Sequence, residues 1–179
     1  KTSQSLDRMT KKAKKSLPYS IKKVCKNLHL SPDNFVITSH KKPLAVTAGL
    51  FFPKIIFSSG LIKKLNYDEL EAVVLHEMYH QRHKHGLLYI LAEAITLAVG
   101  FILPVLKDVT AAMKLEFENM ADKNALSYQG NPYHIVSALN KLSGQTLPSH
   151  FPAFATVVEK RLEQLHSDVT TPPSISKNN

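Results

Sequence analysis

The stretch His76-Glu77-Met78-Tyr79-His80 decides how the rest of the chain is interpreted. Residues four apart on a helix share one face, so both imidazoles can hold a single metal ion. Glu77 lies beside them, where a carboxylate can take a proton from an attacking water. The preceding Val73-Val74-Leu75 is apolar, which argues against a chance match on a solvated helix. The stretch therefore predicts a metal-binding helix.

A third ligand must come from elsewhere, because catalytic zinc needs three protein ligands and one open position. The candidate is Glu118, on a predicted helix that can fold back against the first, and Glu116, which points to a different side, is the second choice. Asp122 shares the face of Glu118 and can accept a hydrogen bond from the distal nitrogen of a ligand histidine. Small Ala121 would let the two helices approach closely. We therefore predict one Zn²⁺ per chain, held by His76, His80 and Glu118.

Two further histidines, His83 and His85, follow the motif in a basic stretch. Their position predicts a solvated helix end, where positive charge is favourable at the negative pole of the helix dipole. Neither is included in the ligand set.

The pattern around the motif indicates the α+β class. Short β-branched and aromatic runs predict strands at 35–38, 44–48 and 54–57. Asn66 followed by Glu69 resembles a capping box that starts a helix running to about His83. Further helices are expected at 110–128, 132–142 and 154–165. We therefore expect a mainly helical domain of zincin geometry, with a small β-sheet packed beside the motif helix.

The two ends of the chain differ in composition from its middle. Residues 1–30 alternate lysines with apolar residues at helical spacing and predict a basic helical lead-in with a joint at Pro18. Residues 167–179 contain Thr-Thr-Pro-Pro and Ser-Lys-Asn-Asn, which predict a disordered tail. The 179 residues can bury one core, so we place a single zinc metallopeptidase domain at 1–166.

Residues 87–106 are almost wholly apolar and are interrupted by Glu93 and Thr96. A helix of this length reaches roughly 30 Å, the thickness of a bilayer core. A single span would carry the following residues away from the motif helix that they must meet. We therefore expect a re-entrant, membrane-facing or core-buried segment, and Glu93 indicates surroundings other than plain lipid.

The net charge of +9 comes mainly from grouped lysines, which attract anions without selecting among them. The chain has few arginines, no tryptophan and no nucleic-acid-binding motif, so nucleic acid is not the expected partner. Lysine-rich segments beside apolar ones favour contact with membrane lipid, and a solvated face that aids solubility is the alternative.

The single cysteine, Cys25, excludes an intrachain disulfide and a cysteine zinc site. This cysteine usage is typical of a reducing, cytoplasmic compartment. The chain begins at Lys1 and has no signal peptide, so it looks like a piece of something longer. We expect it at the cytoplasmic face of a membrane, as part of a longer membrane protein.

These motifs resemble the gluzincin membrane metallopeptidases over about residues 45–142. Residues 48–58 look like the strand pair before the helix, 68–75 like the lead into HExxH, and 118–122 like the third-ligand helix. The closest likeness is to the beta-lactam sensor-transducer (antirepressor) peptidase family, and the next is to the CAAX prenyl protease and HtpX family. The likeness implies a membrane-associated zinc metalloendopeptidase acting on proteins, in regulatory proteolysis. His85 stands in place of the first family's usual aspartate, so an antibiotic-sensing role does not follow.

The predicted reaction is hydrolysis of an internal peptide bond in a protein or peptide substrate, with Glu77 as the general base. Substrate would lie extended beside the strand at 44–48. A second donor to the oxyanion is expected nearby. The candidates, each with a surface or capping role as its alternative, are Tyr133, His134, His150 and Arg161.

Two other functions stay open. A catalytically silent, zinc-containing sensor or regulatory module would close the metal site with a fourth protein ligand, from His85, His134 or His150. A basic nucleic-acid-binding domain would bind phosphate with steep salt dependence and without zinc.

Overall fold

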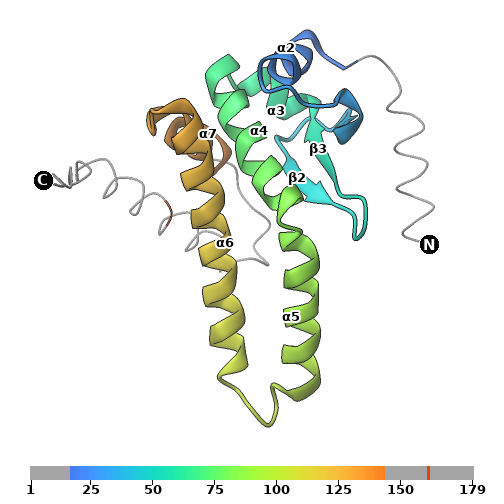
Figure 1. Cartoon of the computed structure of the whole chain (residues 1–179), viewed down its shortest axis with the longest axis vertical. Coiled ribbons are helices and arrows are strands. Elements are labelled where there is room, and N and C mark those ends of the chain that lie inside the picture. Colours follow the sequence, from blue (N-terminus) through green and yellow to red (C-terminus); the bar gives the residue numbers. More distant parts are fainter. Residues whose placement is uncertain (1–16, 144–160, 162–179) are drawn as a thin grey trace, which may run out of the picture.

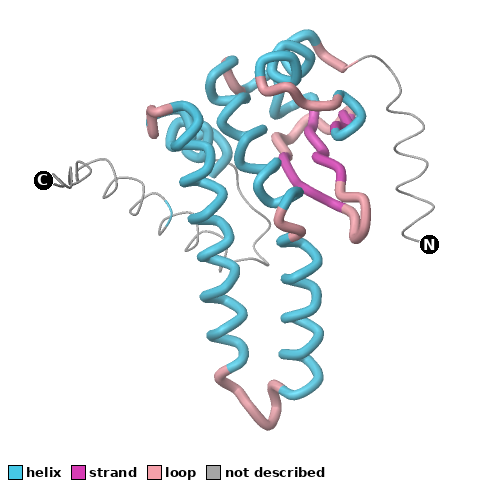
Figure 2. Tube along the Cα trace, viewed as in Figure 1, coloured by secondary structure: helices cyan, strands magenta, loops and turns pink. Residues whose placement is uncertain are grey.

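The computed structural model describes residues 17–143 and Arg161. Helices dominate, and one three-stranded sheet lies beside them (Figures 1 and 2). In chain order the elements are α2 (Tyr19–Asn27), the 3₁₀ turn η1 (Pro32–Asn34), β1 (Phe35–Thr38), β2 (Ala45–Ala48), β3 (Lys54–Ser58), α3 (Ser59–Lys64), α4 (Tyr67–Arg82), α5 (His85–Val99), α6 (Leu106–Gln129) and α7 (Tyr133–Ser143). The predicted α+β class, three strands and motif helix are confirmed. The helix expected at 154–165, the tail at 167–179 and the first part of the lead-in lie outside the described residues.

The sheet has the strand order β1-β3-β2, with β3 parallel to β1 and antiparallel to β2. β2 is therefore an edge strand, and Thr47 on it pairs with Ile55 of the central strand. Gly49 ends β2 with a φ of +117°, which disfavours any residue with a side chain. A Cβ there would also meet the Phe52 carbonyl oxygen at 3.0 Å, so the turn that leads into β3 depends on glycine.

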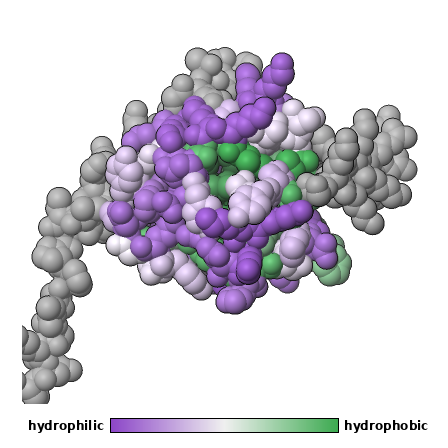
Figure 3. Space-filling model, turned by 90° about the horizontal axis from the view of Figure 1, so that it is seen from above, coloured by the Kyte–Doolittle hydropathy of each residue, from purple (hydrophilic) through white to green (hydrophobic). Residues whose placement is uncertain are grey.

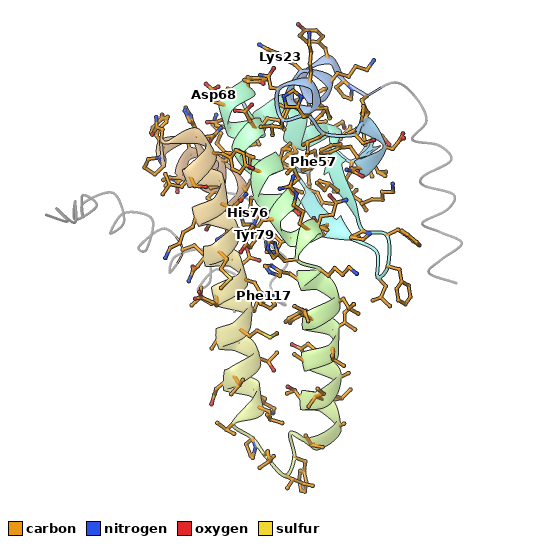
Figure 4. The ribbon with its side chains drawn as sticks, in the orientation of Figure 1. Lys23, Phe57, Asp68, His76, Tyr79 and Phe117 are labelled. Atoms are coloured by element: carbon orange, nitrogen blue, oxygen red, sulfur yellow. The ribbon has the colours of Figure 1, made fainter. Side chains whose placement is uncertain are left out.

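The main core lies between the sheet, α2 and α4. Ile55 and Phe57 of β3 are fully buried, as are Ile21 of α2 and Val74 of α4. Each buried side chain of this size contributes about 1.5–3 kcal/mol of hydrophobic stabilisation. This core fixes the motif helix against the sheet, as Figure 4 shows for Phe57 beside α4.

The motif helix α4 begins where the sequence predicts. Asn66 accepts a hydrogen bond from the Glu69 amide, and the Glu69 carboxylate accepts one from the Asn66 amide, which completes a capping box. Glu69 also accepts hydrogen bonds from Ser137 and Lys141 of α7. The first turn of α4 is therefore tied to α7.

Helix α6 runs beside α4 in the opposite direction (Figure 1). Ala121 and Ala125 of α6 are fully buried, so the two helices meet through small side chains, as predicted for Ala121. Asn124 donates a hydrogen bond to the Leu75 carbonyl oxygen at 3.1 Å. This contact holds α6 in register with the motif.

Helix α5 and the first half of α6 extend away from the rest of the molecule as a helical hairpin, here called the arm (residues 86–113) (Figures 1 and 2). A hydrogen bond of 2.8 Å between the Thr96 and Thr110 hydroxyls joins its two helices. The exposed fractions of Leu97 and Phe101 are 89% and 96%, so core burial of the segment 87–106 is wrong. In the described part of the chain, no helix combines the length and apolar character that a membrane span needs.

The end of the molecule opposite the arm has a different surface. Hydrophilic side chains cover much of it around an apolar patch near its middle (Figure 3). Lys23 of α2 lies at this end (Figure 4). The lysines of α2 are therefore remote from the apolar arm.

Candidate metal centre

Three side chains from α4 and α6 converge in a geometry that could hold a metal ion. His76 Nε2 and His80 Nε2 are 3.0 Å apart; Glu118 Oε2 lies 3.5 Å from His76 Nε2, and Glu118 Oε1 lies 3.5 Å from His80 Nε2. One ligand atom from each residue lies within 4.8 Å of the others. A tetrahedral zinc ion with bonds of about 2.0–2.1 Å separates its ligands by about 3.3 Å, so the three residues fit such an ion.

The far nitrogens of both histidines have partners of their own. His76 Nδ1 lies 2.8 Å from Asp122 Oδ1, as predicted, and His80 Nδ1 lies 2.9 Å from His85 Nδ1. With Nε2 as the ligand atom, Nδ1 of each ring carries the proton and donates it to that partner. Asp122 and His85 therefore orient the two rings toward one point.

The prediction of a solvated position for His85 is wrong. Its side chain is buried and stacks on Phe117, with ring centroids 4.0 Å apart and planes at 10°. Lys84 has a left-handed conformation (φ 52°) between the end of α4 and the start of α5, and the chain turns there so that His85 contacts His80. His83 is exposed, with its Nδ1 3.0 Å from the Tyr79 carbonyl oxygen.

Arg161 is the one predicted oxyanion donor that the structure brings to the site. It is buried, and Nε and Nη2 each donate to an Asp122 oxygen at 2.8 Å. Nη1 lies 2.8 Å from Glu118 Oε2. A guanidinium in this position neutralises and orients both carboxylates.

Two of the other predicted donors, Tyr133 and His134, are not brought to the site. Tyr133 and His134 begin α7 and do not line the cavity described below; the exposed fraction of Tyr133 is 66%. His150 lies outside the described residues.

The three metal-binding residues differ in the direction in which their pKa values are shifted. Burial opposes a charge on His76, but hydrogen bonds to Asp122 and Glu118 outweigh it and raise the pKa of His76 to about 9. Burial, and then the charge on His76, lowers the pKa of His80 to about 3. Burial would raise the pKa of Glu118, yet the hydrogen bond to His76 and the nearby positive charges lower it. Without an ion, the site therefore combines an anionic Glu118, a neutral His80 and a protonated His76, which must release its Nε2 proton when a metal binds.

Glu77 follows the first ligand on α4, and its side chain is almost fully buried. Burial raises the pKa of Glu77 above its ordinary value. The Thr47 hydroxyl on β2 lies 2.8 Å from Glu77 Oε2 and 3.0 Å from the Glu77 carbonyl oxygen. The sequence gives no signal for this contact, because it joins two elements 30 residues apart.

A cavity of about 440 Å³ opens over these groups. One wall is β2, and the opposite wall contains Ile135 and Leu139 of α7; Val73 and Phe117 add further apolar surface. Figure 4 shows His76, Tyr79 and Phe117 where α4 and α6 lie side by side. A chain segment entering this cavity would meet Glu77 and all three ligands.

Comparison with known proteins gives two matches. Residues 11–169, which include every described residue, match peptidase family M48. A Protease HtpX homolog from Campylobacter curvus (strain 525.92) is 27% identical over 167 residues, 75% of this chain and 58% of that protein. The chain thus spans less than two thirds of this relative's length. Because the family match covers most of the chain and contains the whole metal centre, the chain belongs to peptidase family M48, a family of metalloproteases.

Proposed function

We propose that this chain is a zinc-dependent metalloendopeptidase that hydrolyses internal peptide bonds of protein substrates. Zn²⁺ is held by His76, His80 and Glu118. The observation that carries the proposal is the approach of these three ligands to within 4.8 Å beside the buried Glu77 carboxylate. Membership of a peptidase family supports the same reaction.

The chemistry divides between the metal and the chain's own residues. A bound zinc ion would supply a Lewis acid for the scissile carbonyl and for the attacking water. Glu77 accepts the water's proton and passes it to the leaving amine. Arg161 and Asp122 hold Glu118 and His76 in place.

Substrate lies extended along β2 in this proposal. β2 is an edge strand that lines the cavity, so its outer backbone groups can pair with a peptide. The apolar side chains Val73, Ile135 and Leu139 then face the bound segment.

The geometry favours an enzyme over a silent zinc-containing sensor module. A closed structural site needs a fourth protein ligand, and the candidate nearest the centre is His85. Its Nδ1 contacts Nδ1 of His80, on the side of that ring away from His76. Among the described residues, the metal-binding group therefore has three members.

We further propose that the protein works at the cytoplasmic face of a membrane, as part of a longer membrane protein, in regulatory proteolysis. The exposed apolar side chains of the arm support contact with lipid. The special likeness to the sensor-transducer peptidases stays a prediction.

The test combines metal content with hydrolysis. Elemental analysis should find about one zinc per wild-type chain and a clear loss in His76→Ala and Glu118→Gln. Glu77→Gln should keep zinc and lose cleavage of an unstructured protein. The matched control is Glu116→Gln, an exposed carboxylate on the same helix, which should keep both. Zinc that persists in Glu118→Gln would refute the third ligand, and zinc-loaded wild type without cleavage would refute the peptidase.

A further inference from the structure

We infer that Thr47 is a positioning residue that holds the carboxylate of Glu77 in its catalytic orientation. The inference rests on the proposed function, because it assigns Glu77 the role of general base. The Thr47 hydroxyl donates toward Glu77 Oε2 at 2.8 Å, a short hydrogen bond of the charge-assisted kind. Among the described residues, Thr47 is the hydrogen-bond donor to this carboxylate.

The strand that carries Thr47 is well placed to fix this hydroxyl. Thr47 pairs with Ile55 on the central strand, and Ile55 is fully buried in the core. A β-branched side chain on a strand has few χ1 rotamers available. The direction of the hydroxyl is therefore set by the sheet and not by the helix that carries Glu77.

A buried carboxylate needs such a donor. Glu77 is 8% exposed, and a buried acceptor without a partner carries its full desolvation cost. Because Thr47 engages Oε2, rotation of the carboxylate is restricted and Oε1 is left to exchange a proton with water. Without this hydrogen bond the group can turn away from the reacting atoms.

The hydrogen bond to Oε2 can persist while Glu77 carries a proton. The Thr47 hydroxyl has one proton and two acceptors within reach, Oε2 and the Glu77 carbonyl oxygen at 3.0 Å. When Oε1 carries the water's proton, Oε2 is still an acceptor, so the hydroxyl can donate to Oε2 before and after the transfer. Thr47 keeps its own proton throughout, and the transferred proton passes from water through Glu77 to the amine.

The role predicts a loss in kcat with little change in KM. Substrate would pair with the backbone of β2, which the isosteric change Thr47→Val leaves in place. Loss of a hydrogen bond to a charged group corresponds to about a ten- to hundredfold change. We expect kcat of Thr47→Val to fall by that factor, KM to stay within about twofold, and zinc to stay near one per chain. Thr47→Ser, which keeps the hydroxyl, should restore most of kcat.

A matched control comes from the same sheet. The Thr38 hydroxyl on β1 is buried and has no hydrogen-bond partner among the described residues. Thr38→Val makes the same chemical change there and should leave kcat unchanged. If Thr47→Val does not fold, Thr47→Ala compared with Thr47→Ser decides the same question, since only serine retains a donor.

Four results would overturn the role of Thr47: full kcat in Thr47→Val, a loss expressed in KM alone, equal losses in the serine and valine variants, or loss of zinc. Failure of the proposed function is distinguishable, because zinc-loaded wild type would then lack hydrolysis altogether.

Discussion

Asp122 has two partners at the centre of the site, a metal-binding histidine and a buried arginine. Its carboxylate accepts one hydrogen bond from His76 Nδ1 and two from the Arg161 guanidinium. Burial would raise the pKa of Asp122, but the hydrogen bonds from Arg161 and His76 lower it. Asp122 is therefore an anion that fixes the His76 ring and shares Arg161 with Glu118.

The change Asp122→Asn should weaken zinc binding by about 10- to 100-fold, the usual effect of losing a partner of a metal-binding histidine. The reason is that a neutral amide holds the His76 Nδ1–H and Arg161 less strongly. Competition with a chelating dye would measure the affinity. Asp108→Asn, on an exposed position of the arm, is the control. Wild-type affinity in Asp122→Asn would contradict the orienting role.

The sequence predicts the metal-binding residues better than their surroundings. His76, His80, Glu118 and Asp122 could be grouped because i, i+4 spacing on helices is a local property. His85 could not, because five residues on a continuous helix would place it on another face. The contact of Thr47 with Glu77 and those of Arg161 with Asp122 and Glu118 arise from tertiary packing, which single-sequence patterns do not report.

At the scale of elements, Glu69 joins the start of α4 to α7. Its carboxylate accepts from the Asn66 amide, Ser137 and Lys141. Burial would raise the pKa of Glu69, but these hydrogen bonds and the charge of Lys141 lower it. Both the capping box and the strands at 35–38 and 54–58 follow from local residue preferences, whereas the break at Lys84 between α4 and α5 does not.

Glu69→Gln should lower the free energy of unfolding by about 1–3 kcal/mol at pH 7. The pKa of Glu69 is lower in the folded than in the unfolded state, where it is about 4.3. The ionised carboxylate therefore contributes its full stability above about pH 4.3, and this stability is lost as the pH falls through the folded-state pKa. The difference from wild type should therefore shrink in acid. Urea unfolding at pH 7 and about pH 3.5 measures it, with Glu116→Gln as the control. A difference that grows in acid would contradict this account.

At the scale of the whole molecule, the apolar arm and the lysines of α2 lie at opposite ends. The arm exposes Leu97, Phe101 and Ile102, while Lys23 of α2 lies at the other end (Figure 4). Lipid contact through the arm would therefore depend on apolar area more than on the lysines of α2.

Sedimentation with lipid vesicles should show binding of the wild-type chain, and the double change Leu97→Asp and Phe101→Asp should reduce it at least tenfold with zinc content unchanged. The reason is that both side chains are almost fully exposed and would be buried in lipid. Tyr128→Ser, near the other end of α6, is the control. Because the lysines of α2 are remote, 0.5 M salt should weaken binding only slightly. Complete release by salt would assign binding to the lysines instead.

The arm also affects how His80 and Glu118 come together during folding. His80 and Glu118 are separated in sequence by the whole hairpin, and the length-dependent cost of closing a flexible loop of that size is about 3 kcal/mol. The Thr96–Thr110 hydrogen bond and the contact of Lys114 with the face of the Tyr89 ring stabilise the hairpin locally. These local contacts offset the entropic cost of closing the loop. The ligands on α4 and the ligand on α6 are then close together before zinc binds. Zinc binding therefore completes a nearly formed site and does not have to order an unfolded chain.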